Sequence, residues 1–325
     1  MNAGEDILTA PLAGDMADWP MLGLMADVRP SLEAMLRAGP AALATVTAVV
    51  PSGPRPAGTQ MVVGVLGAHD FLSGGCVEAD VAAHARACLD DGQPRRLVYG
   101  EGGPWPDIRL ACGARLDVLA EKIMPDDPAV WTLLKLRRQR RPAYWVSDGL
   151  RRDCAETPPQ VWPGAVSLRH DPPARLAVIG GDPISLAIAA LAAQTGFETL
   201  LIRPRGPTSG PPLDRVAYDR RSPAAALAGF GLDAWTAVAA CSHDPDLDQE
   251  ALMAALPSEA GYVGLLGARA RLGERLAALR AAGLDEAVIA RLKAPIGLDL
   301  GGKAPFEIAL AVLGEIVAEK ARRAA

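Results

Sequence analysis

The chain lacks the residue spacings that build common metal sites and disulfide frameworks. Its four histidines include no HxxxH pair, and its cysteines include no CxxC pair. The five cysteines are widely spaced: Cys76, Cys88, Cys112, Cys154 and Cys241. An odd number of separated thiols is typical of a reducing compartment. We therefore expect neither a zinc ribbon, nor a disulfide scaffold, nor an ordinary metal site.

Positive charge and long apolar runs are also scarce. The formal charge of −5, from 33 Lys and Arg against 38 Asp and Glu, gives no general attraction to nucleic acid or anionic lipid. The nearest approach to a membrane span, residues 176–197, is interrupted by Asp182 and Pro183 and favours a strand, a turn and a helix. The first 30 residues show no basic start followed by an apolar run. These absences predict a cytoplasmic protein with no nucleic-acid or membrane partner.

What is present indicates two folded domains. Half of the 325 residues are hydrophobic, and the chain is long enough for two separate cores. We expect a flexible leader at residues 1–22, an N-terminal α+β domain with a linker at 23–170, and a C-terminal domain at 171–325. Residues 156–164 (ETPPQVWPG) are linker-like in composition.

Apolar spacing predicts the elements of the N-terminal domain. Apolar runs predict strands at residues 41–50, 59–67, 95–99 and 114–119. Helical spacing predicts helices at residues 31–37, 76–92 and 127–141. Ser31 is placed to accept hydrogen bonds from free amides at the start of the first helix.

Short apolar strands alternate with helices in the C-terminal domain. Strands are expected at residues 175–180, 198–203, 235–241 and 261–267, and helices at 184–195, 223–228, 247–256 and 269–282. This alternation predicts a parallel sheet covered on both faces, the doubly wound, Rossmann-like architecture. The predicted fold class is therefore α/β, with an N-terminal α+β domain before a Rossmann-like domain.

A Gly-rich turn of the dinucleotide-binding kind is altered in this second domain. In such a turn, glycines let the backbone approach a pyrophosphate at the start of a helix. Gly180 occupies its expected place, but Asp182 and Ser185 replace the second and third glycines. Arg203 stands where an acid would bind the ribose. NAD(P) is therefore not expected, and the turn is either a scaffold without ordinary NAD binding or a phosphate site for a different dinucleotide.

Several segments together resemble the XdhC/CoxI family of molybdenum-cofactor maturation proteins. In the N-terminal half they are TVTAVVPSGPRPAGTQMVV, LSGGCVEADV and ACGARLDVLAE. In the C-terminal half they are CSHDPDLDQEAL, GYVGLLGARARLGERLAALRAAGL and APIGLDLGGKAPFEIALAVLGEI. They occur in the family's order over residues 30–320. The family more often has an intact Gly-rich turn, so residues 181–185 depart from its pattern.

The resemblance implies a chaperone that binds and protects the sulfurated molybdenum cofactor. Such a chaperone helps to insert the cofactor, as molybdopterin or its cytosine dinucleotide form, into an apo xanthine dehydrogenase-family molybdoenzyme. The resemblance also implies a cysteine desulfurase as a partner that supplies the sulfido ligand, and a homodimer. An NAD(P)-dependent oxidoreductase and a ligand-free docking protein for the client enzyme remain as alternatives.

The candidate cofactor-binding residues of the N-terminal domain centre on Cys76. Gly74, Gly75 and the first amides of the helix expected to open at Cys76 can cradle an anion, and the positive helix end favours a thiolate. A thiolate is a soft ligand, suited to molybdenum or to its sulfido group. The alternative for Cys76 is a small residue packed beside glycines. Glu78 is expected to cap the helix start rather than to act as an acid or base.

Two further residues of this domain are candidates for the same site. Arg55, in PSGPRPAG, is either a guanidinium that grips phosphate or a surface loop charge. Cys112 precedes Gly113 at a predicted strand start, and it either approaches the site or is buried and inert. Cys88 lies on a predicted helix and is expected in the core.

In the C-terminal domain the candidates are His243, Asp299 and Lys303. His243 follows a predicted strand at the carboxyl edge of the sheet, where doubly wound folds bind ligands, and it can hydrogen-bond a pterin or a base. Asp299 and Lys303 flank glycines before Pro305, which opens the last helix, and Lys303 is a candidate phosphate contact. No Ser/His/Asp arrangement or acid pair indicates hydrolysis, so we expect a binding protein rather than an enzyme.

Overall fold

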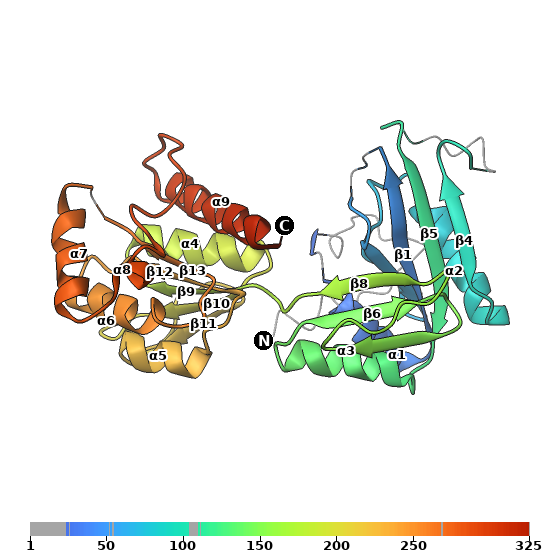
Figure 1. The fold of residues 1–325 in the computed structure, drawn as a ribbon, viewed down its shortest axis with the longest axis horizontal. Coiled ribbons are helices and arrows are strands. Elements are labelled where there is room, and N and C mark those ends of the chain that lie inside the picture. The colour runs from blue at the N-terminus through green and yellow to red at the C-terminus, as the bar shows by residue number, and fades with distance from the viewer. Residues whose placement is uncertain are drawn as a thin grey trace. The chain divides into compact units, whose positions relative to one another are not determined.

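The computed structural model describes residues 24, 25, 27–51, 53, 55–103, 110, 112–267 and 269–324. The leader expected at residues 1–22 lies outside the described residues. The chain divides after Pro172 into two compact units, called here the first unit and the second unit. Figure 1 shows the elements of both.

The first unit contains an antiparallel sheet of five strands and a smaller sheet of three. Its helices are α1 (Arg29–Ala38), α2 (Glu78–Asp91) and α3 (Pro128–Arg138). The strands of the larger sheet are β1 (Ala41–Val50), β2 (Gln60–Gly64), β3 (Gly67–His69), β4 (Arg95–Tyr99) and β5 (Arg115–Ile123). The strands of the smaller sheet are β6 (Ala143–Ser147), β7 (Arg152–Ala155) and β8 (Val166–His170).

β1 lies at the centre of the larger sheet, whose order is β3-β2-β1-β5-β4. Successive side chains of a strand point to opposite faces, so its apolar run serves two cores. Ala42 and Ala44 belong to the core that α2 covers, whereas Ala41 and Leu43 belong to the core shared with α1 and α3. The predicted strand at residues 41–50 is confirmed because burial on both faces requires such a continuous apolar run.

The start of α2 differs from the prediction. The helix begins at Glu78, with Val77 at its N-cap position, so Cys76 precedes the helix instead of opening it. The strand expected at residues 59–67 is in fact a hairpin formed by β2 and β3. The segment between β3 and α2 is therefore a loop, and it carries the Gly-Gly-Cys sequence.

The start of α1 also differs, because Ser31 does not cap it. The helix begins at Arg29, Val28 occupies the N-cap position, and no side chain caps the start. Ser31 is buried in the first turn, where its hydroxyl hydrogen-bonds the carboxyl of Asp70. This contact fixes α1 against the loop that leads to Cys76.

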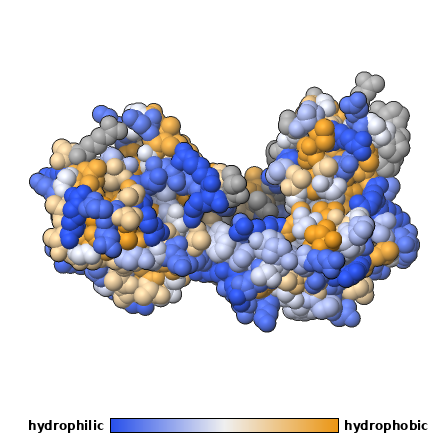
Figure 2. Space-filling model, viewed as in Figure 1, coloured by the Kyte–Doolittle hydropathy of each residue, from blue (hydrophilic) through white to orange (hydrophobic). Residues whose placement is uncertain are grey.

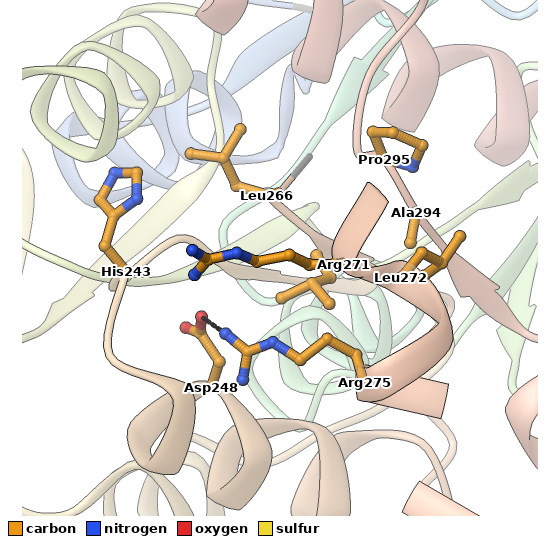
Figure 3. A pocket seen from close by; sticks show the side chains of 10 residues that line it. His243, Asp248, Leu266, Arg271, Leu272, Arg275, Ala294 and Pro295 are labelled. Atoms are coloured by element: carbon orange, nitrogen blue, oxygen red, sulfur yellow. Dashed lines mark ion pairs between the residues drawn. The ribbon is translucent and has the colours of Figure 1, made fainter. Parts of the chain in front are cut away.

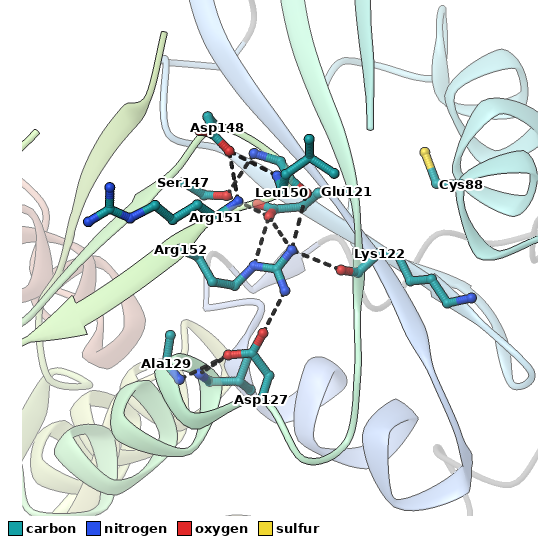
Figure 4. Close-up of polar contacts among 12 residues, drawn as sticks. Cys88, Glu121, Lys122, Asp127, Ala129, Ser147, Asp148, Leu150, Arg151 and Arg152 are labelled. Atoms are coloured by element: carbon teal, nitrogen blue, oxygen red, sulfur yellow. Dashed lines mark hydrogen bonds and ion pairs between the residues drawn. The ribbon is translucent and has the colours of Figure 1, made fainter. Parts of the chain in front are cut away.

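The smaller sheet, in the order β7-β6-β8, is held to the larger one by a buried ion pair. Arg152 of β7 donates from Nε to Oε2 of Glu121 at 3.2 Å and from Nη1 to Asp127 at 2.5 Å (Figure 4). Asp127 also accepts from the amide of Ala129 at 2.9 Å and so caps α3. Burial raises the pKa of Glu121, which Arg152 opposes. Residues 156–164, linker-like in composition, connect β7 to β8 within this sheet.

The second unit is built on a parallel sheet of six strands in the order β11-β10-β9-β12-β13-β14. The strands are β9 (Arg175–Ile179), β10 (Glu198–Ile202), β11 (Val216–Asp219), β12 (Thr236–Ala240), β13 (Tyr262–Leu265) and β14 (Leu292–Lys293). The helices are α4 (Pro183–Gln194), α5 (Pro223–Phe230), α6 (Pro245–Ala255), η2 (Arg269–Arg271), α7 (Leu272–Ala281), α8 (Glu286–Ile289) and α9 (Pro305–Ala324). Helices α4 and α9 cover one face, and α5 to α8 cover the other. The predicted α/β class with a doubly wound second domain is confirmed.

The topology of this sheet predicts which of its edges binds a ligand. The chain runs outward from β9 to β10 and β11, and then returns to the other side of β9 at β12. Order therefore reverses between β9 and β12, and doubly wound folds bind ligands outside the carboxyl ends of the strands at this point. The short strands β11 and β14 were not predicted, because neither forms an apolar run long enough to stand out.

The surface mixes apolar and polar residues, and no helix in the described ranges is both long and apolar enough to span a bilayer. On the face seen in Figure 2, apolar residues form scattered groups among hydrophilic ones. In the second unit, large apolar side chains are exposed on and just before α9: Leu298, Leu300, Phe306, Leu310 and Val317. α9 thus buries one apolar face against α4 and keeps other apolar side chains exposed.

Candidate functional site

The loop that carries Cys76, residues 71–77 and called here the Cys76 loop, is organised around the carboxylate of Glu78. Oε1 of Glu78 accepts from the amides of Leu72 at 3.1 Å and Ser73 at 2.6 Å. Oε2 accepts from the amide of Val77 at 3.1 Å, and the Ser73 hydroxyl bonds both oxygens. Glu78 is only 1% exposed. These contacts satisfy the helix start and support the structural role expected for Glu78.

The tip of the Cys76 loop is turned outward. Gly74, Gly75 and Cys76 are exposed, whereas the residues on either side of them are buried. The Cys76 amide donates to the Ser73 hydroxyl at 3.1 Å. The amides of Gly74 and Gly75 donate to no other residue in the described ranges. Gly75 has φ +100°, a backbone conformation that favours glycine. The tip therefore presents an exposed thiol beside two amides that no described residue uses.

The base of the Cys76 loop holds an arginine and a buried acid. Arg55 donates to the carbonyl of Phe71 at 3.4 Å, so the structure brings this predicted residue to the loop. Asp70, 4% exposed and with φ 69°, has its pKa raised to about 7, chiefly by burial. The Ser31 hydroxyl and the Arg55 charge oppose that rise. Sequence reasoning missed Asp70, because neither its burial nor its backbone conformation leaves a local pattern.

Cys112 lies just before β5, near the end of the sheet that contacts the first turn of α2. The Tyr99 hydroxyl donates to Asp80, in the first turn of α2, at 2.6 Å. Tyr99 is paired with Leu116 in the sheet, four residues after Cys112. Cys112 itself is exposed in the turn before β5, and no hydrogen bond joins it to the Cys76 loop among the described residues. The alternative that Cys112 is buried is therefore wrong, and its approach to the site stays a prediction.

Cys88 differs from both exposed thiols. It is fully buried under the sheet, and its Sγ lies 3.5 Å from the carbonyl of Ala120, to which it donates. Burial raises the pKa of this thiol. The expected core role of Cys88 is confirmed. All five cysteines are free, and no cluster of His, Cys, Asp and Glu among the described residues is arranged to hold a metal ion.

In the second unit, the carboxylate of Asp182 occupies the altered Gly-rich turn where a ligand phosphate would bind. Asp182 caps α4 by accepting from the amide of Ser185 at 2.9 Å and from its hydroxyl at 2.5 Å. Its other oxygen lies 2.9 Å from Nε2 of His243, which follows β12. Burial alone raises the pKa of Asp182, but the bonds from Ser185 and His243 outweigh burial and lower it. The turn thus keeps a negative charge at the helix start.

The donor set at this turn does not fit a dinucleotide diphosphate. The α4 amide that would hold phosphate is bound by Asp182, and a second anion there would be repelled. A side chain on Gly180 would overlap the Ser185 hydroxyl, and one on Gly181 would overlap Arg203. The glycines therefore serve packing against protein side chains.

Asp299 and Lys303 lie in the exposed segment between β14 and α9. The start of α9 is capped by Glu307, which accepts from the amides of Lys303 at 2.8 Å and Ala304 at 2.9 Å. Glu307 therefore occupies two amides at this helix start, and the exposed Lys303 side chain stays a predicted phosphate contact. A cavity of about 340 Å³ lies on the other side of His243, next to Arg271. Sequence reasoning did not single out that arginine.

The predicted residues fall into two sets. Those around Cys76 belong to the first unit: Gly74, Gly75, Cys76, Arg55 and Cys112. Those near the carboxyl edge of the parallel sheet belong to the second unit: His243, Asp299 and Lys303. Within the first set, Gly74 and Gly75 are part of the Cys76 loop, and Arg55 contacts it at Phe71. Within the second, His243 contacts the altered turn.

Comparison with known proteins gives two family matches on this chain. Residues 35–100 match the XdhC and CoxI family, and residues 176–316 match the XdhC Rossmann domain. The first match includes Arg55 and the Cys76 loop. The second includes the parallel sheet and most of α9.

Two curated relatives span most of the chain. The molybdenum cofactor insertion chaperone PaoD of Escherichia coli is 30% identical over 89% of this chain and 86% of its own length. A probable xanthine dehydrogenase subunit of Bacillus subtilis is 26% identical over 87% of this chain and 94% of its own.

A solved structure described as a xanthine dehydrogenase from Bacillus halodurans shares the fold. It superposes with a TM-score of 0.71 over 91% of this chain and 96% of that chain, at 22% identity. The likeness covers both units, and the identity of the PaoD relative is spread over nearly the whole sequence. Together with the two domain matches, these findings show that the chain belongs to the XdhC and CoxI family.

Proposed function

We propose that this protein is a molybdenum cofactor-binding chaperone that helps to mature a xanthine dehydrogenase-family molybdoenzyme. The names of its two curated relatives support this role. The observation that carries the proposal within this chain is the exposed tip of the Cys76 loop. There a free thiol lies beside two amides that no described residue uses.

The chemistry of the tip fits the cargo. Molybdenum cofactor is a pterin that carries a phosphate and a dithiolene-bound, oxygen-sensitive metal. Cys76 supplies a soft sulfur for the metal end, and the amides of Gly74 and Gly75 supply donors for oxo or sulfido groups. Arg55, at the loop base, adds positive charge. Because Glu78 fixes the loop from behind, the tip is held in place before the cargo binds.

Several finer proposals rest on the family resemblance. The cargo is the sulfurated cofactor, a cysteine desulfurase supplies its sulfido ligand, and the protein acts in the cytoplasm as a homodimer. The free thiols of Cys76 and Cys112 agree with a reducing compartment. The exposed apolar side chains on α9 provide a surface for a protein partner.

The decisive experiment is anaerobic loading with molybdenum cofactor followed by transfer to an apo client enzyme. Wild type, Cys76→Ser and Cys112→Ser are compared by bound molybdenum, bound pterin and client activity. Loss of a metal contact weakens retention by Cys76→Ser about tenfold or more, equivalent to about 1.4 kcal/mol. Cys112→Ser is the matched exposed-thiol control.

The outcomes separate the alternatives. Equal loading and transfer by Cys76→Ser removes Cys76 from the site. Wild type that retains neither pterin nor molybdenum, yet binds the client, is a docking protein. Tight, saturable binding of NAD or NADP by wild type supports an oxidoreductase instead. Because Cys76 is exposed, its substitution leaves folding unchanged, which circular dichroism checks.

A further inference from the structure

A cavity of about 340 Å³ opens at the carboxyl ends of β12, β13 and β14 in the second unit. Its wall is formed by residues that follow three different strands: His243 after β12, Leu266 after β13, and Pro295 after β14 (Figure 3). Leu272, the first residue of α7, closes another side. The volume is that of a small-ligand pocket, and the position is the edge where doubly wound sheets bind ligands.

The two arginines of this cavity are not equivalent. Arg275 is held by the protein, with Nη1 donating to the Pro245 carbonyl at 3.0 Å and Nη2 3.6 Å from Asp248. The Arg271 side chain forms no hydrogen bond or ion pair with any other residue that the structure describes. Figure 3 shows its side chain reaching into the cavity toward His243. A guanidinium in this position offers a fork of donors that matches phosphate.

Asp248 does not cancel this charge. It is 1% exposed, and its Oδ1 accepts from the amide and hydroxyl of Ser242 at 3.0 and 2.6 Å. Its other oxygen faces Arg275. The acid is therefore committed to fixing the 242–248 turn and the Arg275 side chain, and Arg271 is left as the available cation.

The starts of the helices around this edge give an independent argument. Four of them are supplied with an internal carboxylate that accepts from backbone amides: α4 by Asp182, α5 by Glu250, α6 by Asp244 and α9 by Glu307. At α7 no side chain caps the start, and its N-cap residue is Arg271 itself. A helix start favours negative charge; here the N-cap residue is a cation, and the acid of the first turn, Glu274, makes no cap bond.

We propose that this cavity is a subsite for the phosphate group of the carried ligand, with Arg271 as its principal contact. The proposal rests on the proposed function, because the cargo is a phosphate ester. The phosphate is bound by the Arg271 fork and by the start of α7, and Arg275 adds positive charge. The rest of the cavity, lined by Leu266 and Pro295, takes part of the organic group attached to the phosphate. In an ordinary dinucleotide-binding domain the phosphate lies at the helix start that corresponds to α4, where Asp182 occupies an amide in this protein. Here the phosphate lies at the start of α7 instead.

Titration calorimetry with the cofactor-free protein tests the subsite. The probes are inorganic phosphate, adenosine 5′-monophosphate and adenosine, so that a phosphate requirement is separated from binding of a base. We expect wild type to bind inorganic phosphate and adenosine 5′-monophosphate but not adenosine. Arg271→Ala should weaken the affinity for both phosphate compounds about tenfold or more. Arg271→Lys keeps the charge but loses the two-pronged guanidinium, so its affinity for both phosphates should lie between those of wild type and Arg271→Ala. Arg280→Ala, at the far end of α7 and paired with Glu286, is the control and binds as wild type does.

Two results overturn the subsite: wild type that binds neither phosphate, or Arg271→Ala that binds them as tightly as wild type. Failure of the proposed function is recognised separately, because these probes contain no molybdenum and Cys76→Ser should bind them normally. Loading with molybdenum cofactor then links the two. Arg271→Ala with undiminished retention of cofactor overturns the assignment of the subsite to the cargo.

Discussion

Two turns in this protein have similar sequences and opposite behaviour. Each contains a Gly-Gly pair before a helix, and in each a carboxylate close in sequence accepts hydrogen bonds from backbone amides. In the Cys76 loop the acid, Glu78, comes after the glycines and is buried behind them, so the glycines face outward. In the second turn the acid, Asp182, directly follows the glycines, caps α4 and contacts His243. The position of the acid relative to the glycines thus decides whether a Gly-rich turn is open or closed to a ligand.

The largest expected effect comes from removing the acid of the open turn. Glu78→Ala leaves buried donors at Leu72, Ser73 and Val77 without an acceptor. We expect the free energy of unfolding to fall by about 4 kcal/mol, measured by urea denaturation. Glu78→Gln keeps one acceptor oxygen and should lose about half as much. Equal stability of wild type and Glu78→Ala would show that the carboxylate does not shape the loop.

The next effect is a pH dependence at the base of the same loop. The pKa of Asp70 is about 7, above its ordinary value of about 3.9, so the folded state binds this proton more tightly than the unfolded chain. Stability is therefore lost as pH rises from about 4 to about 7. Asp70→Asn, which is neutral throughout and tolerates the left-handed backbone, should be more stable than wild type by about 4 kcal/mol at about pH 8 and equal to it near pH 4.

The control for that experiment is Asp90→Asn, because Asp90 is an exposed acid on α2. Its stability should follow wild type at every pH. A constant difference between Asp70→Asn and wild type across the range would contradict titration of Asp70.

The smallest effect concerns the closed turn. Asp182→Ala removes a helix cap and the partner of His243. We expect a loss of about 1 kcal/mol in the free energy of unfolding of the second unit, measured by thermal denaturation. The matched control is Asp285→Ala, because Asp285 occupies the N-cap position of α8 without making a side-chain cap bond. Losses of the same size in both variants would mean that Asp182 does not hold the turn.

Much of the fold could be predicted because apolar patterns record burial. Strands at residues 41–50 and 95–99 were predicted to the residue, because the first is a long apolar run and the second ends in the apolar residues Leu97, Val98 and Tyr99. The start of α2 was predicted two residues early, because Cys76 and Val77 continue the helical spacing and the bonds to Glu78 appear only in three dimensions.

The candidate site was predictable only where its residues are neighbours in the sequence. The family resemblance located the Cys76 loop as one continuous segment. Arg271 escaped notice because it meets His243 only when parallel strands bring their carboxyl ends together. Asp70 escaped notice because its pKa depends on burial under α1, more than thirty residues away in the chain.

The central place of β9 has a consequence for synthesis of the chain. β9 pairs on one side with β10, which is made soon after it, and on the other with β12, where Arg175 meets Thr236. A nascent chain that ends before β12 therefore leaves one edge of this central strand open to pairing with other chains. α4 must likewise wait for α9, which follows all other described elements of the second unit, to cover it (Figure 1). The second unit thus completes its sheet and its helix layers only after the chain from β9 through α9 has been made.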